Sequence, residues 1–156
     1  MPKKPKKHNT TKHLIDVKQP RAVVTPQGDK VPRAIVTPNE NCQPDFRTDQ
    51  MDLKGQWHWD NLESSHLQDL LQKIIHSQKL TWQDLREHGS HLVDVSKLIS
   101  DAQKRLREIG KDDLDQLYSL RLSGQRRIWG IKENNILWLL WWDPLHSVCL
   151  SLKKHT

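Results

Sequence analysis

The chain has 156 residues, enough for one ordinary domain with a tail, and its formal net charge is +6. Its longest apolar run, residues 136–142, is far shorter than the about 20 residues of a membrane helix, and residues 1–18 lack the apolar stretch of a signal peptide. The two Cys residues lie far apart, which excludes a disulfide framework. We therefore expect a soluble, cytoplasmic protein without membrane contact.

Residues 1–50 are rich in Pro, Lys, Thr, Asn and Gln and show no lasting periodicity, so they predict a mostly disordered, basic arm. Six Lys against one Asp within residues 1–18 supply most of the net charge. Such an arm attracts polyanions without sequence preference. A solvated terminus without a ligand is the alternative interpretation.

A short segment inside this arm is duplicated: PRAVVTP at residues 20–26 recurs as PRAIVTP at residues 32–38. Proline at both ends favours an extended conformation and excludes a central strand. The copies can be a bivalent docking motif, a strand added to the edge of another sheet, or a duplicated linker. The sequence leaves these three interpretations open.

The folded domain is expected over residues 51–156. Residues 56–59 alternate as a short strand would. Apolar residues at helical spacing then predict an amphipathic helix over residues 63–77, capped by Ser64 or Ser65.

Two shorter helices follow. Thr81 has the side chain of an N-cap and Gly89 is a typical terminator, so the first covers residues 82–88. The second begins at Ser96 or Ser100 and ends at Gly110, and a further helical turn is expected over residues 112–116.

After this turn the hydrophobic period changes from 3.6 to 2. Four strands are predicted, over residues 118–122, 126–132, 136–142 and 147–150. The fold class is therefore α+β, with helices followed by a small antiparallel four-stranded sheet.

Asn134 and Asn135 suit a two-residue hairpin loop, which fixes the register of the strands beside it. Arg126 then faces Asp143 and has an ion-pair partner, whereas Arg127 lies on the opposite face with no acid assigned to it. The same register pairs Ile131 with Trp138, Trp129 with Leu140, and Arg127 with Trp142.

Residues 119–129, SLRLSGQRRIW, resemble the strand-turn-strand core of the RelE/ParE toxin superfamily, and YoeB-like members above all. The segment WWDPLH at residues 141–146, followed by KKH at residues 153–155, is similar to the C-terminal strand and tail of that superfamily. In these toxins a His or Tyr near the chain end often completes the active site.

The resemblance implies a toxin that cleaves messenger RNA in the ribosomal decoding site, without a metal or another cofactor, and that a cognate antitoxin restrains. Arg127 aligns with the family Arg at the scissile phosphate, and Arg121 aligns with the Arg of the preceding strand. Arginine suits this role because its planar fork stays charged. His146 can act as general acid or base, and an exposed loop histidine is the alternative.

Four further residues are candidates for RNA contact. Lys132 borders the hairpin tip, Lys153 and Lys154 extend a basic end, and Trp142 can stack on a base. Solvated charges, a frayed terminus and a core tryptophan are the respective alternatives. His88 and His91 near Asp94 lack a second ligand pair, so no metal site is expected.

Two other functions stay open. One is a ParE-like inhibitor of a macromolecular target that does not cut RNA, and the other is a non-enzymatic RNA- or ribosome-binding protein whose basic arm supplies most of the affinity. A cleft shared by Arg127 and His146 would favour the nuclease, because a binding module needs no proton carrier beside its phosphate clamp.

Overall fold

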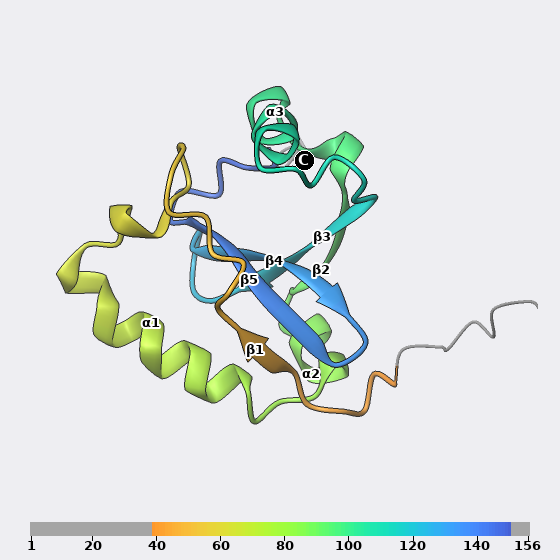
Figure 1. The fold of residues 1–156 in the computed structure, drawn as a ribbon. Coiled ribbons are helices and arrows are strands. Elements are labelled where there is room, and N and C mark those ends of the chain that lie inside the picture. Colours follow the sequence, from red (N-terminus) through yellow and green to blue (C-terminus); the bar gives the residue numbers. More distant parts are fainter. Residues whose placement is uncertain (1–38, 151–156) are drawn as a thin grey trace, which may run out of the picture. The chain divides into compact units, whose positions relative to one another are not determined.

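The computed structural model describes residues 39–150, which lie within one compact unit of the chain (Figure 1). The duplicated Pro-bounded segment and most of the predicted basic arm lie outside the described residues, as do Lys153 and Lys154.

The described chain is an α+β fold built on one mixed five-stranded sheet. The strand order is β1-β5-β4-β3-β2, in which β1 runs parallel to β5 and all other neighbours are antiparallel. The strands are β1 (Asp45–Arg47), β2 (His91–Asp94), β3 (Gln116–Arg121), β4 (Arg127–Glu133) and β5 (Ile136–Asp143).

The prediction of a four-stranded antiparallel sheet is therefore wrong at both ends. Strands β1 and β2 were not expected, and β1 precedes residue 51, where the domain was predicted to begin. Residues 147–150 form no strand. Instead Val148 is fully buried against one face of the sheet, and its carbonyl accepts a hydrogen bond from the Ile99 amide.

The helices follow the predicted order with shifted boundaries. They are α1 (Ser64–Ser77), α2 (Trp82–Glu87) and α3 (Ser100–Glu108), with 3-10 turns η1 (Trp59–Asn61) and η2 (Val95–Lys97). Thr81 and Asp84 form a reciprocal capping box on α2, as the sequence indicates. The predicted serine cap of α1 is wrong, because Glu63 occupies that position without a side-chain bond.

Two shorter predictions also fail. Residues 112–116 contain a turn that leads into β3, and residues 56–59 are not a strand. There the chain lies along β5 instead: the Trp57 carbonyl accepts from the Trp142 amide, and the Trp59 indole donates to the Leu140 carbonyl.

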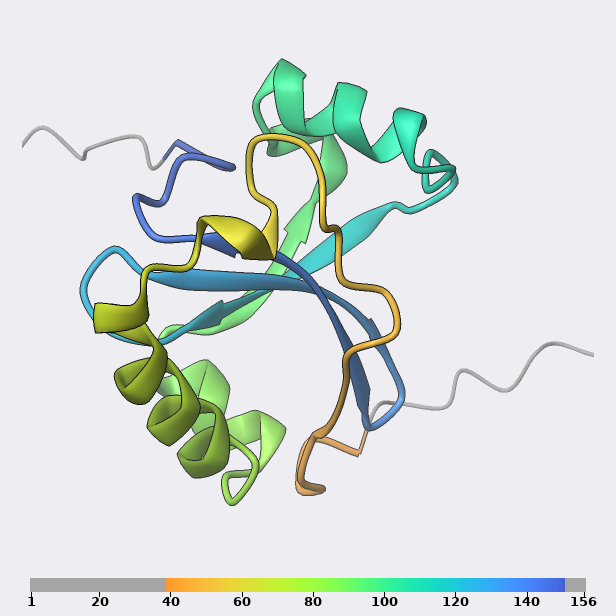
Figure 2. The same ribbon diagram turned by 60° about the vertical axis from the view of Figure 1, so that its left-hand side comes forward.

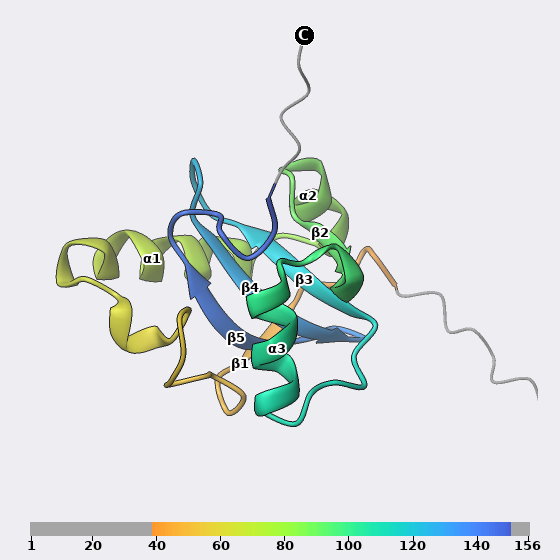
Figure 3. The same cartoon turned by 90° about the horizontal axis from the view of Figure 1, so that it is seen from above.

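The helices pack on opposite faces of the sheet (Figures 1 and 2). On the first, called the α3 face, Ala102 and Leu106 of α3 pack with Trp129 and Trp141. On the second, the α1–α2 face, Leu70 of α1 and Trp82 of α2 belong to a separate core cluster. Figure 3 looks onto the sheet from the side of α3. The strand residues therefore alternate between two cores.

A β-bulge in the hairpin of β4 and β5 displaces the register. Pairing follows the prediction from Glu133–Ile136 to Gly130–Leu139, then steps by one residue so that Trp129 faces Trp141. Leu140 is the extra residue, and its carbonyl accepts from the Asp52 amide and from the Trp59 indole. Every pair beyond the bulge consequently differs from the predicted one.

Candidate functional site

Four basic side chains come from neighbouring elements at the same end of the α3 face. His91 begins β2, Arg121 ends β3, Arg127 begins β4, and His146 follows β5. Arg121 and Arg127 are directly opposite in the ladder, and His91 pairs with Ser119, the residue opposite Trp129. We call His91, Arg121, Arg127 and His146 the cation cluster.

A cavity of about 260 Å³ opens beside this cluster. Both histidines line it, together with the sheet residues Ser119 and Trp129. The remaining lining residues are Leu92, Val93, Lys97 and Cys149.

The two arginines of the cluster have no carboxylate partner among residues 39–150, whereas Arg47, Arg86, Arg105 and Arg126 all form ion pairs there. The Nη1 atom of Arg127 donates to the carbonyls of Gly124 and Arg126, each at 2.9 Å.

The cationic environment is visible in the acid–base properties of the cluster. Burial lowers the pKa of Arg127, and the charge of Arg121 lowers it further, with Asp143 opposing. Burial also lowers the pKa of His146, and Arg127 adds to this effect while Asp143 again opposes it. The cluster therefore holds a positive charge that a bound anion would relieve.

Asp143 is fully buried and positions the loop that carries His146. Its carboxylate accepts from the Trp129 indole at 3.1 Å, from the Ser147 amide at 2.9 Å and from the Val148 amide at 3.1 Å. These bonds turn the chain back over the α3 face. His146 takes a φ of 55° in this turn, a left-handed conformation that costs a residue with a Cβ about 1 to 2 kcal/mol.

The predicted trio of Arg121, Arg127 and His146 thus shares one region, although part of the reasoning behind it fails. Arg127, not Arg126, faces Asp143, because the bulge shifts the register. Arg126 forms its ion pair with Asp69 of α1 at 2.7 Å, on the other face of the sheet.

Two predicted RNA-contact residues lie elsewhere. Trp142 is 1% exposed and packs in the core of the α1–α2 face, so its ring is not available to stack on a base. Lys132 lies on that same face, where its Nζ atom is 4.5 Å from the centre of the Trp82 ring. Neither belongs to the cation cluster.

His91 is the cluster member that the sequence did not reveal as a partner of His146. Its Nδ1 atom donates to the Gly89 carbonyl at 3.1 Å, which leaves Nε2 as the acceptor of a neutral ring. The only sequence signal that places His91 on the α3 face is its alternation with the buried Val93. Strand β2 has only four residues, too few for this alternation to be recognised.

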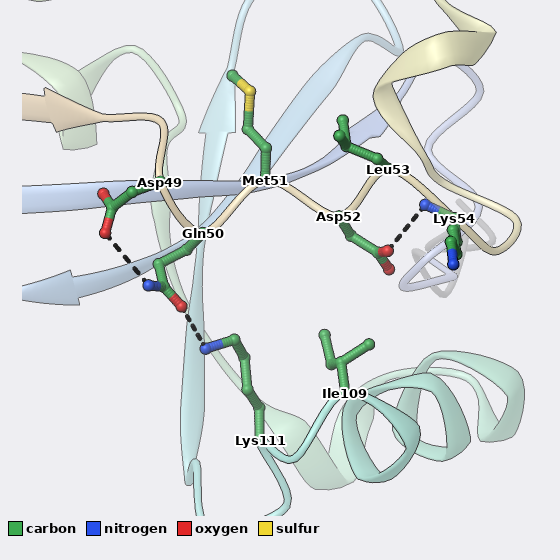
Figure 4. A pocket seen from close by; sticks show the side chains of 8 residues that line it. All are labelled: Asp49, Gln50, Met51, Asp52, Leu53, Lys54, Ile109 and Lys111. Carbon is green, nitrogen blue, oxygen red and sulfur yellow. Dashed lines mark hydrogen bonds between the residues drawn. The ribbon is translucent and has the colours of Figure 1, made fainter.

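A larger hollow of about 370 Å³ lies between residues 49–54 and the end of α3 (Figure 4). Its polar groups bind one another: Lys111 Nζ donates to Gln50 at 2.7 Å, and the Lys54 amide donates to Asp52 at 3.0 Å. Burial alone would raise the pKa of Asp52, but hydrogen bonds from Arg105, Lys54 and Trp141 lower it. The polar groups that line this hollow are therefore held by hydrogen bonds within the chain.

Within residues 39–150 no three His, Cys, Asp or Glu side chains are grouped as metal ligands would be. In the same part of the chain, no helix has the length and apolar character needed to span a membrane.

Comparison of the chain with protein-family models, with curated proteins and with solved structures found no match.

Proposed function

We propose that the protein is a metal-independent endoribonuclease of the toxin type, with its active site at the cation cluster. The observation that carries this proposal is that two arginines, free of carboxylate partners within residues 39–150, lie opposite each other at the end of the sheet where two histidines line one cavity. The short resemblance to RelE/ParE toxins supports the same reaction.

The reaction is a transesterification at phosphorus. The 2′-oxygen forms a bond to phosphorus while the bond to the 5′-oxygen breaks, which leaves a 2′,3′-cyclic phosphate and a 5′-hydroxyl. Arg127 and Arg121 bind the phosphate oxygens and stabilise the charge of the pentavalent transition state.

The two histidines divide the proton transfers. His146 takes the proton of the 2′-hydroxyl, because its lowered pKa keeps the imidazole neutral at neutral pH. His91 in its protonated form gives a proton to the leaving 5′-oxygen. Both histidines line the same cavity, and a base and an acid that act on one phosphorus must share a site in this way.

The ribosome and a cognate antitoxin belong to this proposal as partners. An antitoxin that covered the cation cluster would need carboxylates, since Arg121 and Arg127 have none of their own among the described residues. Support for the ribosome comes from the sequence resemblance alone.

Induced expression tests the proposal. We expect the wild-type chain to arrest growth with cleavage of messenger RNA, and Arg127→Ala or His146→Ala to lower the cleavage rate by about 100-fold or more. Arg107→Ala is the matched control, because Arg107 is an exposed residue of α3 outside the cluster. Arrested cells whose messenger RNA stays intact would contradict a nuclease.

A binding function without cleavage is the second candidate, and the unpaired arginines alone would suffice for it. The two candidates differ at His146. If the protein only binds, His146→Ala should leave both the growth effect and the RNA affinity close to wild type, while Arg127→Ala should weaken both.

A further inference from the structure

A second cavity, of about 240 Å³, lies at the edge of the sheet on the α1–α2 face. Trp82 at the start of α2, Tyr118 of β3, Leu92 of β2 and Lys132 of β4 line it, and the Glu40–Arg86 ion pair borders it. Trp82 and Tyr118 meet edge to face, with 5.1 Å between their ring centres. The cavity is therefore an aromatic pocket with charged groups around it.

The two aromatic side chains carry polar atoms that have no partner within the described residues. Trp82 is 3% exposed and Tyr118 is 4% exposed, yet neither the indole Nε1 nor the phenolic oxygen makes a hydrogen bond there. The Ser90 hydroxyl lies near that of Tyr118 without reaching hydrogen-bond geometry. Buried polar groups nearly always have a partner, so this pair points to an acceptor that enters the cavity.

Lys132, which also lines the cavity, is a hydrogen-bond donor like the indole and the phenol. Lys132 Nζ lies over the Trp82 ring and donates one hydrogen bond, to the Asn134 carbonyl at 3.2 Å. Desolvation lowers the pKa of Lys132, with Cys42 and Glu40 opposing. Burial raises the pKa of Tyr118, so its hydroxyl keeps its proton. Indole, phenol and ammonium together offer hydrogen-bond donors to a ligand.

We propose that this aromatic pocket binds a keto nucleobase, guanine or uracil, of the same RNA strand that the cation cluster holds by its phosphate. This inference rests on the proposed function and adds base selection to it. The two cavities are neighbours: His91 and Leu92 of the edge strand β2 line both of them. A strand whose phosphate lies on the α3 face can place an adjacent base around this edge.

The donors decide between the bases. Guanine and uracil present carbonyl oxygens, which accept hydrogen bonds from an indole, a hydroxyl or an ammonium. Adenine and cytosine present an exocyclic amino group at the corresponding position, and this group is itself a donor. Trp82 and Tyr118 are almost fully buried, so their rings offer no open face for stacking and add only apolar contact, which carries no base preference.

Binding of short RNA strands tests this inference. The probe is an adenosine-rich hexamer, methylated at every 2′-oxygen so that it is not cleaved, with one central position occupied in turn by each of the four bases. We expect guanosine and uridine to bind about five- to tenfold more tightly than adenosine and cytidine. Tyr118→Phe should remove most of this preference.

The phenylalanine variant keeps the ring and removes only a hydroxyl that has no hydrogen-bond partner within the described residues, so its thermal stability should match the wild type or exceed it. Lys132→Met is a second variant with the same expectation for base preference. Lys104→Met, at an exposed position of α3 away from both cavities, is its control.

Failure of this inference is distinct from failure of the proposed function. If Arg127→Ala weakens all four hexamers but the four bind equally to the wild type, the pocket does not read keto bases and the phosphate site stands. A preference for adenosine or cytidine, or one that survives Tyr118→Phe, would also overturn the inference. If Arg127→Ala leaves every affinity unchanged, the proposed function itself fails.

Discussion

At the scale of single residues, the site depends on which of two adjacent arginines carries an unpaired charge. Arg126 is held by Asp69 of α1, whereas Arg127 reaches only backbone carbonyls with its side chain and lies on the face that carries His146. Asp143 does not neutralise Arg127 through an ion pair, because its oxygens are occupied by Trp129, Ser147 and Val148. The charge of Arg127 therefore stays available to act on its neighbours.

The titration of His146 is a direct measure of this charge. We expect the pKa of His146 to lie below its ordinary value of 6.5 and to rise in Arg127→Gln, because burial remains but the strongest repelling charge is gone. The folded chain binds this proton more weakly than the unfolded chain. His146 therefore lowers stability as the pH falls below about 6.5, and this loss should be smaller in the variant.

The measurement is an NMR titration of the imidazole C–H resonances. Arg126→Gln is the matched control, since it removes the same charge one residue away on the other face of the sheet, where Asp69 already pairs with it. A shift of the His146 pKa that is equal in both variants would show that Arg127 has no special proximity.

At the scale of elements, the bulge in β5 sets which residues of the hairpin face the site. Gly130 lies where the register steps, and a Cβ added there would come within 2.6 Å of the Trp138 carbonyl oxygen and 2.8 Å of Leu137 Cδ1. The carbonyl belongs to the paired strand and cannot move away without breaking the ladder.

Gly130→Ala is accordingly expected to lower the free energy of unfolding by about 1 to 3 kcal/mol, the usual range for overpacking a dense core. Urea unfolding followed by tryptophan fluorescence measures it. Glu133→Ala, at an exposed position of the same hairpin, should change stability by less than about 0.5 kcal/mol. An alanine variant as stable as wild type would mean that the two strands separate easily at the bulge.

The bulge also explains what the sequence could and could not predict. The predicted register of the β4–β5 hairpin is correct from Glu133 to Gly130, because the Asn134–Asn135 turn and the alternation of side chains determine it there. It is wrong beyond the point where Leu140 is inserted. The insertion depends on donors from the distant Asp52 and Trp59, which no local pattern reveals.

The same limit applies to the sheet edges and to the site. Strands β1 and β2 have three and four residues, too few for a period of 2 to stand out. The strands that carry Arg121 and Arg127 could be predicted from the sequence because they have six and seven residues, enough for the alternation to stand out. The second histidine and the aromatic pocket both depend on β2, so both emerged only from the fold.

At the scale of the whole molecule, the charge is unevenly distributed along the chain. Of its 25 Lys and Arg and 19 Asp and Glu, residues 39–150 hold 14 and 17, so the described part has a formal net charge of −3 while the whole chain has +6. The cation cluster is a local exception within an acidic domain. If the protein binds RNA as proposed, general electrostatic attraction must therefore come mainly from residues outside this part of the chain.

Residues 1–18 hold six of the basic residues outside the described part, so under the proposed function their removal should change the salt dependence of RNA binding. We expect a variant without residues 1–18 to lose more affinity at low salt than at high salt, with a shallower slope of log affinity against log salt. Each lost phosphate contact to a single strand reduces that slope by about 0.7.

A full-length variant with Gln at Lys3, Lys4, Lys6, Lys7, Lys12 and Lys18 separates charge from chain length, and it should reproduce the shallower slope. Arg127→Ala should behave differently, because it removes about one phosphate contact and lowers affinity at every salt concentration. If the glutamine variant keeps the wild-type slope, the N-terminal lysines make no phosphate contacts. RNA would then be drawn to an acidic domain by the cation cluster and the remaining basic residues alone.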